Sequence, residues 1–148
     1  MIKISYTPED IVDHEALGMI IKDKDGKILM QDHIKYGFFT IPVGKAKPGQ
    51  TLSDALKEEL FDECDIKVKD FKKIATKNYT YIRNGHKVKL HGHLLEVIKY
   101  SGTIKNKEPH KHRTQKFYDL ETIKKMPYLS DMTLLYLDFL GFKRKARI

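Results

Sequence analysis

Five acidic side chains lie within ten residues of a chain that is otherwise basic, and this concentration suggests chemistry. They are Asp54, Glu58, Glu59, Asp62 and Glu63. In a helix, Glu59, Asp62 and Glu63 would project from one face, because residues three and four apart are neighbours there. Hard cations such as Mg²⁺ prefer carboxylate oxygen and bridge to substrate phosphates. The spacing therefore indicates a metal site, with a solvated acidic face as the alternative.

Local signals around these acids predict a helix over residues 52–64. Pro48-Gly49 marks a turn, and Thr51 followed by Asp54 fits a capping box. An apolar stripe at helical spacing is formed by Leu52, Ala55, Leu56 and Leu60. The acids lie mostly in the last two turns, where the helix dipole disfavours each anion by roughly 0.3–1 kcal/mol. A sequence optimised only for stability would carry lysines there.

Residues 44–66 resemble the Nudix box, the signature of hydrolases that cleave nucleoside diphosphates linked to another moiety. Its pattern is G-x5-E-x7-R-E-U-x-E-E-x-G-U, with U a bulky aliphatic residue. The matching residues are Gly44, Glu59, Leu60, Glu63 and Ile66, with Asp62 as a conservative replacement. Gln50, Glu58 and Asp65 stand where the family has glutamate, arginine and glycine, and Val43 replaces a glycine of the preceding loop.

The resemblance implies that Glu59, Asp62, Glu63 and the Gly44 carbonyl hold Mg²⁺, or Mn²⁺ in its place. The departures affect the groups around these ligands. With Glu58 at the arginine position the site is more anionic, and Lys57 or a lysine from elsewhere would have to compensate. The resemblance assigns no function to Glu58. One alternative is that this acid takes over a role near the metal.

A further glutamate, Glu108, lies in a basic loop at residues 105–113. It resembles the family's loop glutamate, which follows the hairpin and approaches the metals as an additional ligand or as the base. The resemblance therefore adds Glu108 to Glu59 and Glu63 as catalytic residues, with either Glu63 or Glu108 as the base. An exposed acid among lysines is the alternative.

Several residues outside the box are candidate substrate contacts. Lys45, Lys47 and Arg113 could hold phosphates, with solvated charge as the alternative. Tyr79 and Tyr81 share one face of a predicted strand and could line a substrate cavity, although packing is the simpler interpretation. His91 and His93 share a face of the next strand, but no third ligand at zinc spacing accompanies them, so structural histidines are favoured over a zinc site, and the same holds for His110 and His112.

The remaining patterns predict an α/β (α+β) fold, and the resemblance makes it a Nudix-type α/β/α sandwich with a mixed sheet between helices. The expected strands are residues 2–6, 16–21, 27–31, 38–41, 71–82 and 87–98. The second and third should form a hairpin through residues 23–26, and the last two a hairpin through Asn84-Gly85. Helices are expected at residues 119–127 and 130–140. The last is strongly apolar, which suits packing on the sheet or a homodimer contact.

Length and composition fit one domain over residues 1–148, large enough to bury a core. The single cysteine, Cys64, excludes an internal disulfide and fits a reducing compartment. No apolar run approaches the ~20 residues that span a bilayer, and no signal-peptide core is seen at the start, so a cytoplasmic protein without membrane contact is expected. With 28 Lys+Arg against 20 Asp+Glu, the surface should attract anions.

These observations predict a Mg²⁺-dependent Nudix hydrolase whose partner is a small nucleotide pyrophosphate such as ADP-ribose, FAD or a dinucleoside polyphosphate. The basic surface keeps RNA 5′ ends open as substrates. One alternative is a catalytically weakened Nudix-fold module that binds a nucleotide or RNA without cleaving it. Another is a basic nucleic-acid-binding protein in which the acidic helix is incidental.

Overall fold

The structure is a computed structural model and describes residues 14–83 and 85–142. The described chain forms these elements in order: β1 His14–Ile20, β2 Ile28–His33, β3 Phe38–Thr40, β4 Val43–Lys45, α1 Leu52–Cys64, β5 Lys67–Arg83, β6 His86–Ser101, β7 His112–Tyr118, α2 Leu120–Lys125 and α3 Asp131–Phe139. The strand expected at residues 2–6 and the turn residue Asn84 lie outside the described residues. No helix among those described is long and apolar enough to cross a bilayer.

The strands form two sheets. A four-stranded sheet has the order β4-β1-β6-β5, and a three-stranded sheet has the order β3-β2-β7. β1 runs parallel to β6 and antiparallel to β4, so the larger sheet is mixed. The predicted antiparallel hairpin of residues 71–82 and 87–98 is confirmed as β5 and β6, and Gly85 in its turn has a φ of 79°.

The prediction that residues 16–21 and 27–31 pair as a hairpin is wrong except next to the turn that joins them. Antiparallel contact is limited to the ends of the two segments, where Lys22 bridges Ile28 and Leu29 N donates to Ile21 O at 2.9 Å. Both edges of β1 are already taken by β4 and β6, which leaves no edge for β2. β2 therefore enters the other sheet, between β3 and β7.

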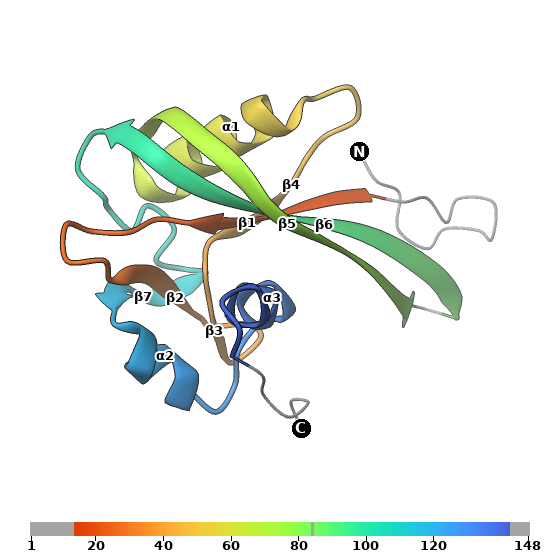
Figure 1. The fold of residues 1–148 in the computed structure, drawn as a ribbon. Helices are drawn as coiled ribbons and strands as arrows, with labels where there is room; N and C mark the ends of the chain where they lie inside the picture. The colour runs from red at the N-terminus through yellow and green to blue at the C-terminus, as the bar shows by residue number, and fades with distance from the viewer. Residues whose placement is uncertain (1–13, 84, 143–148) are drawn as a thin grey trace.

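The mixed sheet packs between α1 on one face and α3 on the other, which is the predicted layered arrangement (Figure 1). Alternate residues of β1 explain this, because Leu17 and Met19 pack in the cluster with α1 whereas Ile20 packs in the cluster with α3. Gly18 lies under α3, where a Cβ would come within 2.8 Å of Met132. Burial on both faces accounts for the continuous apolar run of this strand.

The helix that carries the acids has the predicted bounds. Thr51 is its N-cap and its side chain accepts a hydrogen bond from Asp54 N at 3.0 Å. Asp65 ends the helix in the left-handed region, with a φ of 63°, where the family has glycine. α2 and α3 likewise begin after N-cap residues, Asp119 and Ser130, within the ranges expected for these two helices.

Candidate active site

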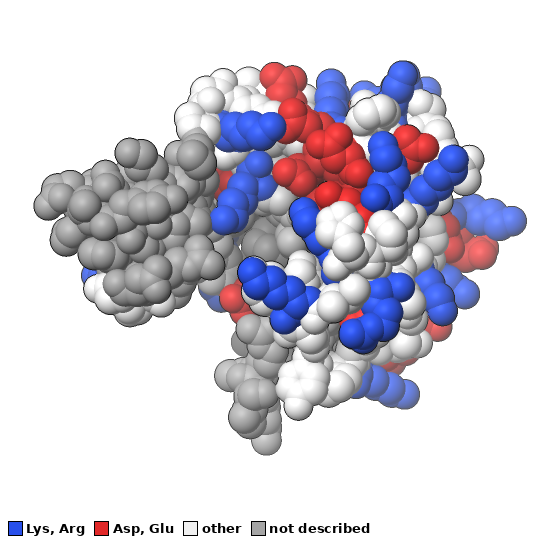
Figure 2. Space-filling model, turned by 180° about the vertical axis from the view of Figure 1, so that it is seen from behind, with Lys and Arg blue, Asp and Glu red and all other residues white. Residues whose placement is uncertain are grey.

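A cleft of about 270 Å³ lies where β4, α1 and the segment from Glu108 into β7 meet. We call it the acidic cleft, and its lining residues are His33, Val43, Gly44, Lys45, Glu59, Glu63, Glu108, Lys111 and His112. From the side opposite to Figure 1, acidic side chains form a patch at the level of α1, bordered by lysine and arginine side chains (Figure 2). Cations thus surround a locally negative site.

Gly44 lets β4 pass directly over a carboxylate of α1. A Cβ at Gly44 would lie 2.5 Å from both Cγ and Cδ of Glu59, which is closer than real Cβ contacts. β4 is held at this distance by its antiparallel pairing with β1, in which Gly44 lies opposite Leu17. A side chain at position 44 would therefore displace Glu59 from the cleft.

Glu63 is the most deeply buried acid of the cleft, with 6% of its surface exposed. Gln31 Nε2, from β2, donates to Glu63 Oε1 at 3.2 Å and to Gln115 Oε1 at 2.8 Å. Gln115 Nε2 in turn donates to the Lys105 carbonyl at 3.1 Å. This buried amide chain fixes the orientation of the Glu63 carboxylate.

Glu59 and Glu63 lie one helical turn apart and have perturbed acidities. Burial, then hydrogen bonding to Glu59, raises the pKa of Glu63 to about 9. Burial also raises the pKa of Glu59, with a further contribution from the charges of Asp62 and Glu108. Two carboxylates brought together away from water share a proton unless a cation is present. The pair therefore provides a site whose negative charge a divalent ion would balance.

Glu108 is brought to the same place by a tight turn. Its carbonyl accepts hydrogen bonds from Lys111 N at 2.9 Å and from His112 N at 3.0 Å. One ligand atom each from Glu63, Glu108 and His112 lie within 4.8 Å of one another. The structure thus places the predicted Glu108 beside Glu63.

His112 belongs to this cluster, although its sequence context favoured a structural or exposed role. The sequence feature that could have indicated His112 as a site residue is its position four residues after Glu108, at the start of a strand. His112 is 4% exposed. Its burial, and next the charge of the neighbouring His33, lower the pKa of His112 to about 4, so the imidazole is neutral near pH 7. A neutral imidazole can act as a ligand or a hydrogen-bonding group.

Asp62, a predicted metal ligand, is exposed and does not line the acidic cleft. Glu59 and Glu63 are four residues apart and lie nearly one above the other, whereas Asp62 is turned by about 100° from Glu63 around the helix. Its charge still contributes to the raised pKa of Glu59. Asp62 therefore lies at the rim of the site.

Two divergent positions of the box, Gln50 and Glu58, form a small network with Lys47. Lys47 Nζ lies 2.7 Å from Glu58 Oε1, and Gln50 Oε1 accepts from Lys47 N at 2.9 Å. The pKa of Lys47 is raised first by Glu58 and also by Asp62 and Glu59. The sequence left open whether Lys57 or another lysine compensates for the charge of Glu58, and in the structure that lysine is Lys47. Lys47 does not line the acidic cleft.

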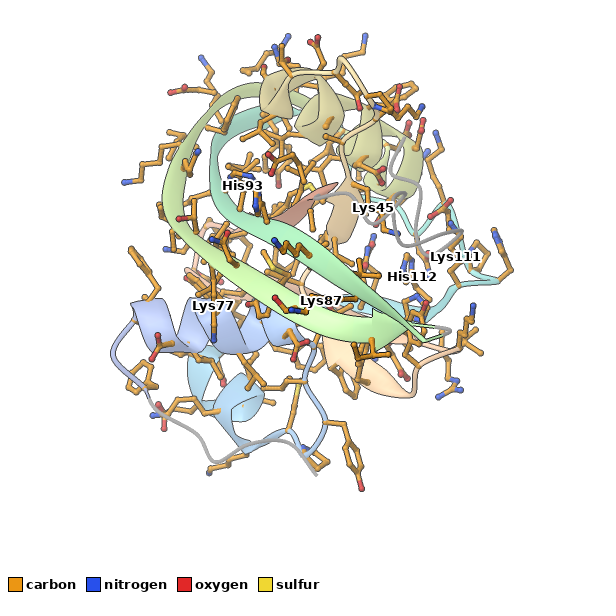
Figure 3. The ribbon with its side chains drawn as sticks, turned by 90° about the vertical axis from the view of Figure 1, so that its right-hand side faces the viewer. Lys45, Lys77, Lys87, His93, Lys111 and His112 are labelled. Atoms are coloured by element: carbon orange, nitrogen blue, oxygen red, sulfur yellow. The ribbon has the colours of Figure 1, made fainter. Side chains whose placement is uncertain are left out.

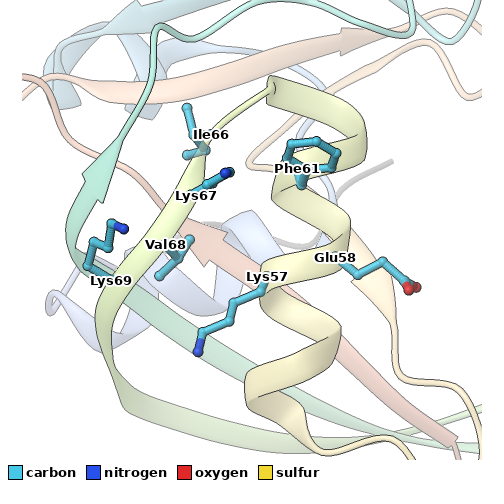
Figure 4. A pocket seen from close by; sticks show the side chains of 7 residues that line it. All are labelled: Lys57, Glu58, Phe61, Ile66, Lys67, Val68 and Lys69. Carbon is cyan, nitrogen blue, oxygen red and sulfur yellow. The ribbon is translucent and has the colours of Figure 1, made fainter.

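Lys57 points to the other side of α1, away from the direction of Glu58 (Figure 4). It borders a second depression of about 470 Å³, which we call the lysine hollow. The residues that line the lysine hollow are Lys57, Glu58, Phe61, Ile66, Lys67, Val68 and Lys69.

The other predicted substrate residues are dispersed. Lys45 lines the acidic cleft and lies on the same side of the β5–β6 hairpin as Lys111 and His112 (Figure 3). Arg113 instead pairs with Asp32 at 3.2 Å outside the cleft. Tyr79 packs toward α3, with its hydroxyl 3.4 Å from the Asp131 carbonyl. The side chain of Tyr81 lies outside what the structure describes.

The histidine pair of β6 has a carboxylate partner that spacing did not reveal. His93 Nε2 lies 2.6 Å from Glu15 Oε2, and His91 Nδ1 lies 3.6 Å from Glu15 Oε1. Glu15 comes from the neighbouring β1, opposite His91. Contacts with Glu15 across the sheet therefore account for this pair, in agreement with the structural interpretation.

Comparison with known proteins gives a family match and structural neighbours. The family described as NUDIX domain matches residues 12–136. No curated protein sequence gives a significant match. The E. coli ORF135 protein, in a solution structure, superposes with a TM-score of 0.71 at 23% identity, covering 90% of this chain and 91% of its own.

Two further solved structures show the same fold. A MutT NUDIX hydrolase from Burkholderia pseudomallei has a TM-score of 0.64 at 18% identity, covering 74% of this chain and 85% of its own. A C. elegans Ap4A hydrolase, in a binary complex, has a TM-score of 0.58 at 21% identity, covering 88% of this chain and 98% of its own. At these identities the likeness concerns the fold.

Proposed function

Because the chain belongs to the NUDIX domain family, we propose that it uses Mg²⁺, or Mn²⁺ in its place, to hydrolyse the pyrophosphate of a nucleoside diphosphate linked to another moiety. The family match confirms the predicted class of enzyme, a Nudix pyrophosphohydrolase. The observation that carries the proposal is the meeting of Glu59, Glu63 and Glu108 in one cleft, with Gly44 directly over Glu59.

The acids fit a divalent cation, because half-buried Glu59 lies beside buried Glu63 and the proton that they share can be exchanged for a metal charge. We assign Glu59, Glu63 and the Gly44 carbonyl as ligands, with Asp62 reaching in from the rim. When bound, the ion supplies charge for the phosphate oxygens and lowers the pKa of a coordinated water.

The remaining cleft residues take the proton and hold the phosphates. Glu108 accepts the proton of the attacking water, since it lies on a loop whereas Glu63 is held by Gln31. Lys45 and Lys111 bind the outer phosphate oxygens, because both line the cleft. The water oxygen bonds to one phosphorus while the bridging P–O bond breaks, and the products are two phosphorylated fragments.

The size of the acidic cleft supports recognition of the pyrophosphate itself. At about 270 Å³ it is at the lower end of ligand-pocket volumes, so groups attached to the pyrophosphate would extend over its rim. ADP-ribose, FAD and dinucleoside polyphosphates meet this description, and one structural neighbour is an Ap4A hydrolase. An RNA 5′ end also meets it, favoured by the net charge of +8.

A substrate panel tests the proposal. The protein is incubated with Mg²⁺ or Mn²⁺ and each of ADP-ribose, FAD, a dinucleoside polyphosphate, nucleoside triphosphates and 5′-triphosphorylated RNA, and phosphorylated products are quantified. Metal-dependent turnover of at least one compound is expected, and Glu59→Gln should remove it. Glu121→Gln, a change in an exposed acid of α2, is the matched control and should keep the wild-type rate.

A binding module without turnover is the second candidate, and it is favoured by one observation. The arginine position of the box is occupied by Glu58, whose partner Lys47 lies outside the acidic cleft. Nucleotide binding that persists without metal-dependent turnover on any panel compound would replace the hydrolase by this module. Steeply salt-dependent RNA or DNA binding that Glu59→Gln leaves unchanged would instead favour the basic nucleic-acid-binding protein.

A further inference from the structure

His112 brings a nitrogen atom to the acids of the cleft. A ring nitrogen of His112 and one carboxylate oxygen each of Glu63 and Glu108 lie within 4.8 Å of one another. Ligands around one metal ion are separated by roughly 3–4 Å, because each lies about 2.0–2.2 Å from it. A small inward movement of these side chains would bring all three atoms to a shared cation.

The described surroundings of His112 hold its backbone and give one of its ring nitrogens no partner. Its N–H donates to the Glu108 carbonyl at 3.0 Å, and its carbonyl accepts from Asn106 Nδ2 at 2.8 Å. The ring packs edge-on against His33, with 5.5 Å between ring centroids. Its Nδ1 atom is buried and has no hydrogen-bond partner among residues 14–83 and 85–142. Buried polar atoms are normally paired, so this nitrogen calls for a ligand.

We propose that His112 is a direct metal ligand together with Glu63 and Glu108, and that its imidazole makes the site select a divalent transition metal over Mg²⁺. This inference rests on the proposed function and specifies its metal. Imidazole is a good ligand for transition metals, whereas Mg²⁺ favours oxygen-only surroundings. Mn²⁺ shares the preference of Mg²⁺ for carboxylate oxygen, and as a transition metal it also binds imidazole nitrogen, so it is the probe for a site of two carboxylates and one imidazole.

The assignment is compatible with the catalytic role of Glu108. A carboxylate has two oxygens, and one is sufficient for the metal. Lys111 Nζ lies 3.5 Å from Glu108 Oε2, so one oxygen of this carboxylate faces the lysine. Glu108 can therefore bind with one oxygen and accept the proton of water with the other.

Pulsed electron paramagnetic resonance of the Mn²⁺-loaded wild-type protein tests the inference directly. Nitrogen bonded to Mn²⁺ modulates the electron spin echo, and labelling the histidines with ¹⁵N changes the modulation pattern. We expect a histidine nitrogen signal that changes on labelling. This measurement uses the unmodified chain, so it does not depend on how a variant folds.

Variants assign the signal to one histidine. His112→Gln should abolish the nitrogen modulation and weaken Mn²⁺ binding by about tenfold or more, whereas Mg²⁺ binding should change much less. His33→Gln changes the neighbouring cleft histidine and His110→Gln an exposed histidine of the same loop, and both should keep the modulation. Circular dichroism and thermal unfolding of each variant monitor folding.

The outcomes separate the inference from the proposed function. Mn²⁺ bound without a histidine nitrogen signal would overturn the role of His112 and leave the carboxylate site standing. A signal that survives in His112→Gln would also overturn it. Absence of Mn²⁺ and Mg²⁺ binding at the acids would overturn both the inference and the metal-dependent hydrolase.

Discussion

The two sides of α1 carry depressions of different size and chemistry. The acidic cleft, of about 270 Å³, gathers three glutamates, two of which have raised pKa values. The lysine hollow, of about 470 Å³, has an apolar floor bordered by lysines (Figure 4). The one acid of its lining, Glu58, is paired with Lys47. The charged groups of the lysine hollow are mostly exposed lysines, whereas the acidic cleft holds three glutamates that are buried or half-buried beside one another.

This difference indicates which side performs chemistry. Burial of like charges costs stability, and such arrangements concentrate at functional sites. Lysines around an apolar floor place only their charged ends in water, which is ordinary for a surface. The smaller depression is therefore the better candidate for the active site.

The largest effect should come from replacing a buried acid of the cleft. Glu63→Gln keeps the shape of the side chain but removes the charge that holds the metal, so we expect turnover to fall on the order of 10²–10³-fold. Steady-state kinetics on the best panel substrate measures it. Asp62→Asn, at the rim, should lose less than about tenfold. Equal losses for the two variants would contradict the assignment of Asp62 to the rim.

A methyl group at Gly44 should also damage the cleft. The Cβ of Gly44→Ala would lie 2.5 Å from Glu59 Cγ and Cδ, so either β4 or the Glu59 side chain must shift. We expect a loss of about 10–100-fold in turnover and a decrease of about 1–3 kcal/mol in the free energy of unfolding. Denaturant unfolding and kinetics measure the two effects. Gly26→Ala, at a positive φ with nothing near the added Cβ, should lower stability without lowering turnover, and it therefore separates the effect of the clash at Gly44 from a general loss of stability.

Removal of the Gln31 amide, which orients Glu63, should weaken metal binding in the acidic cleft less than loss of the Glu63 charge does. Gln31→Leu deletes the hydrogen bond to Glu63 Oε1, and outer groups of this kind typically contribute about 10–100-fold to metal affinity or activity. Isothermal titration with Mn²⁺ measures the loss. Gln31→Glu retains the size but adds a charge, and it should bind metal differently from the leucine variant. Unchanged Mn²⁺ affinity in both variants would show that the amide chain has no part in binding.

The metal-free protein should become less stable as pH rises. The pKa of Glu63 is raised to about 9 in the folded chain from 4.5, so the folded state retains a proton that the unfolded chain releases. The associated stability is fully present below about pH 4.5 and is lost as the pH rises toward 9. Thermal unfolding in a chelator at several pH values measures this slope. Mg²⁺ should reduce it, and Glu63→Gln should show a flatter slope than the wild type.

The smallest effect should come from the opposite side of the helix. Lys57→Ala removes an exposed cation of the lysine hollow and should change the free energy of unfolding by less than about 0.5 kcal/mol. Turnover should also stay near the wild-type value. A large loss of activity in Lys57→Ala would show that the lysine hollow participates in catalysis, and the contrast between the two sides would fail.

Local patterns in the sequence were sufficient for much of the fold. The helix bounds at Leu52 and Cys64 follow from the Thr51 cap and the apolar stripe, and the β5–β6 hairpin follows from two alternating runs around Asn84-Gly85. These signals act between residues that are close in the chain. The same applies to Glu59 and Glu63, because helical geometry alone brings residues four apart together.

Pairing over long separations was decided by the tertiary structure. β1 and β2 enter different sheets because β4 and β6 occupy both edges of β1, which no signal in the turn between them reveals. Gln31 reaches Glu63 only because β2 packs beside α1, although a polar residue at the end of a buried strand was a sign of some such contact. Lys47, rather than Lys57, meets Glu58 because the loop before α1 folds back on the helix.

By itself, the sequence therefore determined the acidic helix, its box and the family that the box indicates. Only the tertiary structure decided which acids are buried, that Asp62 lies at the rim, and that His112 joins Glu63 and Glu108. The physical reason is that helix geometry and capping are properties of neighbouring residues. Burial and the approach of β7 to α1 depend instead on how the whole chain packs.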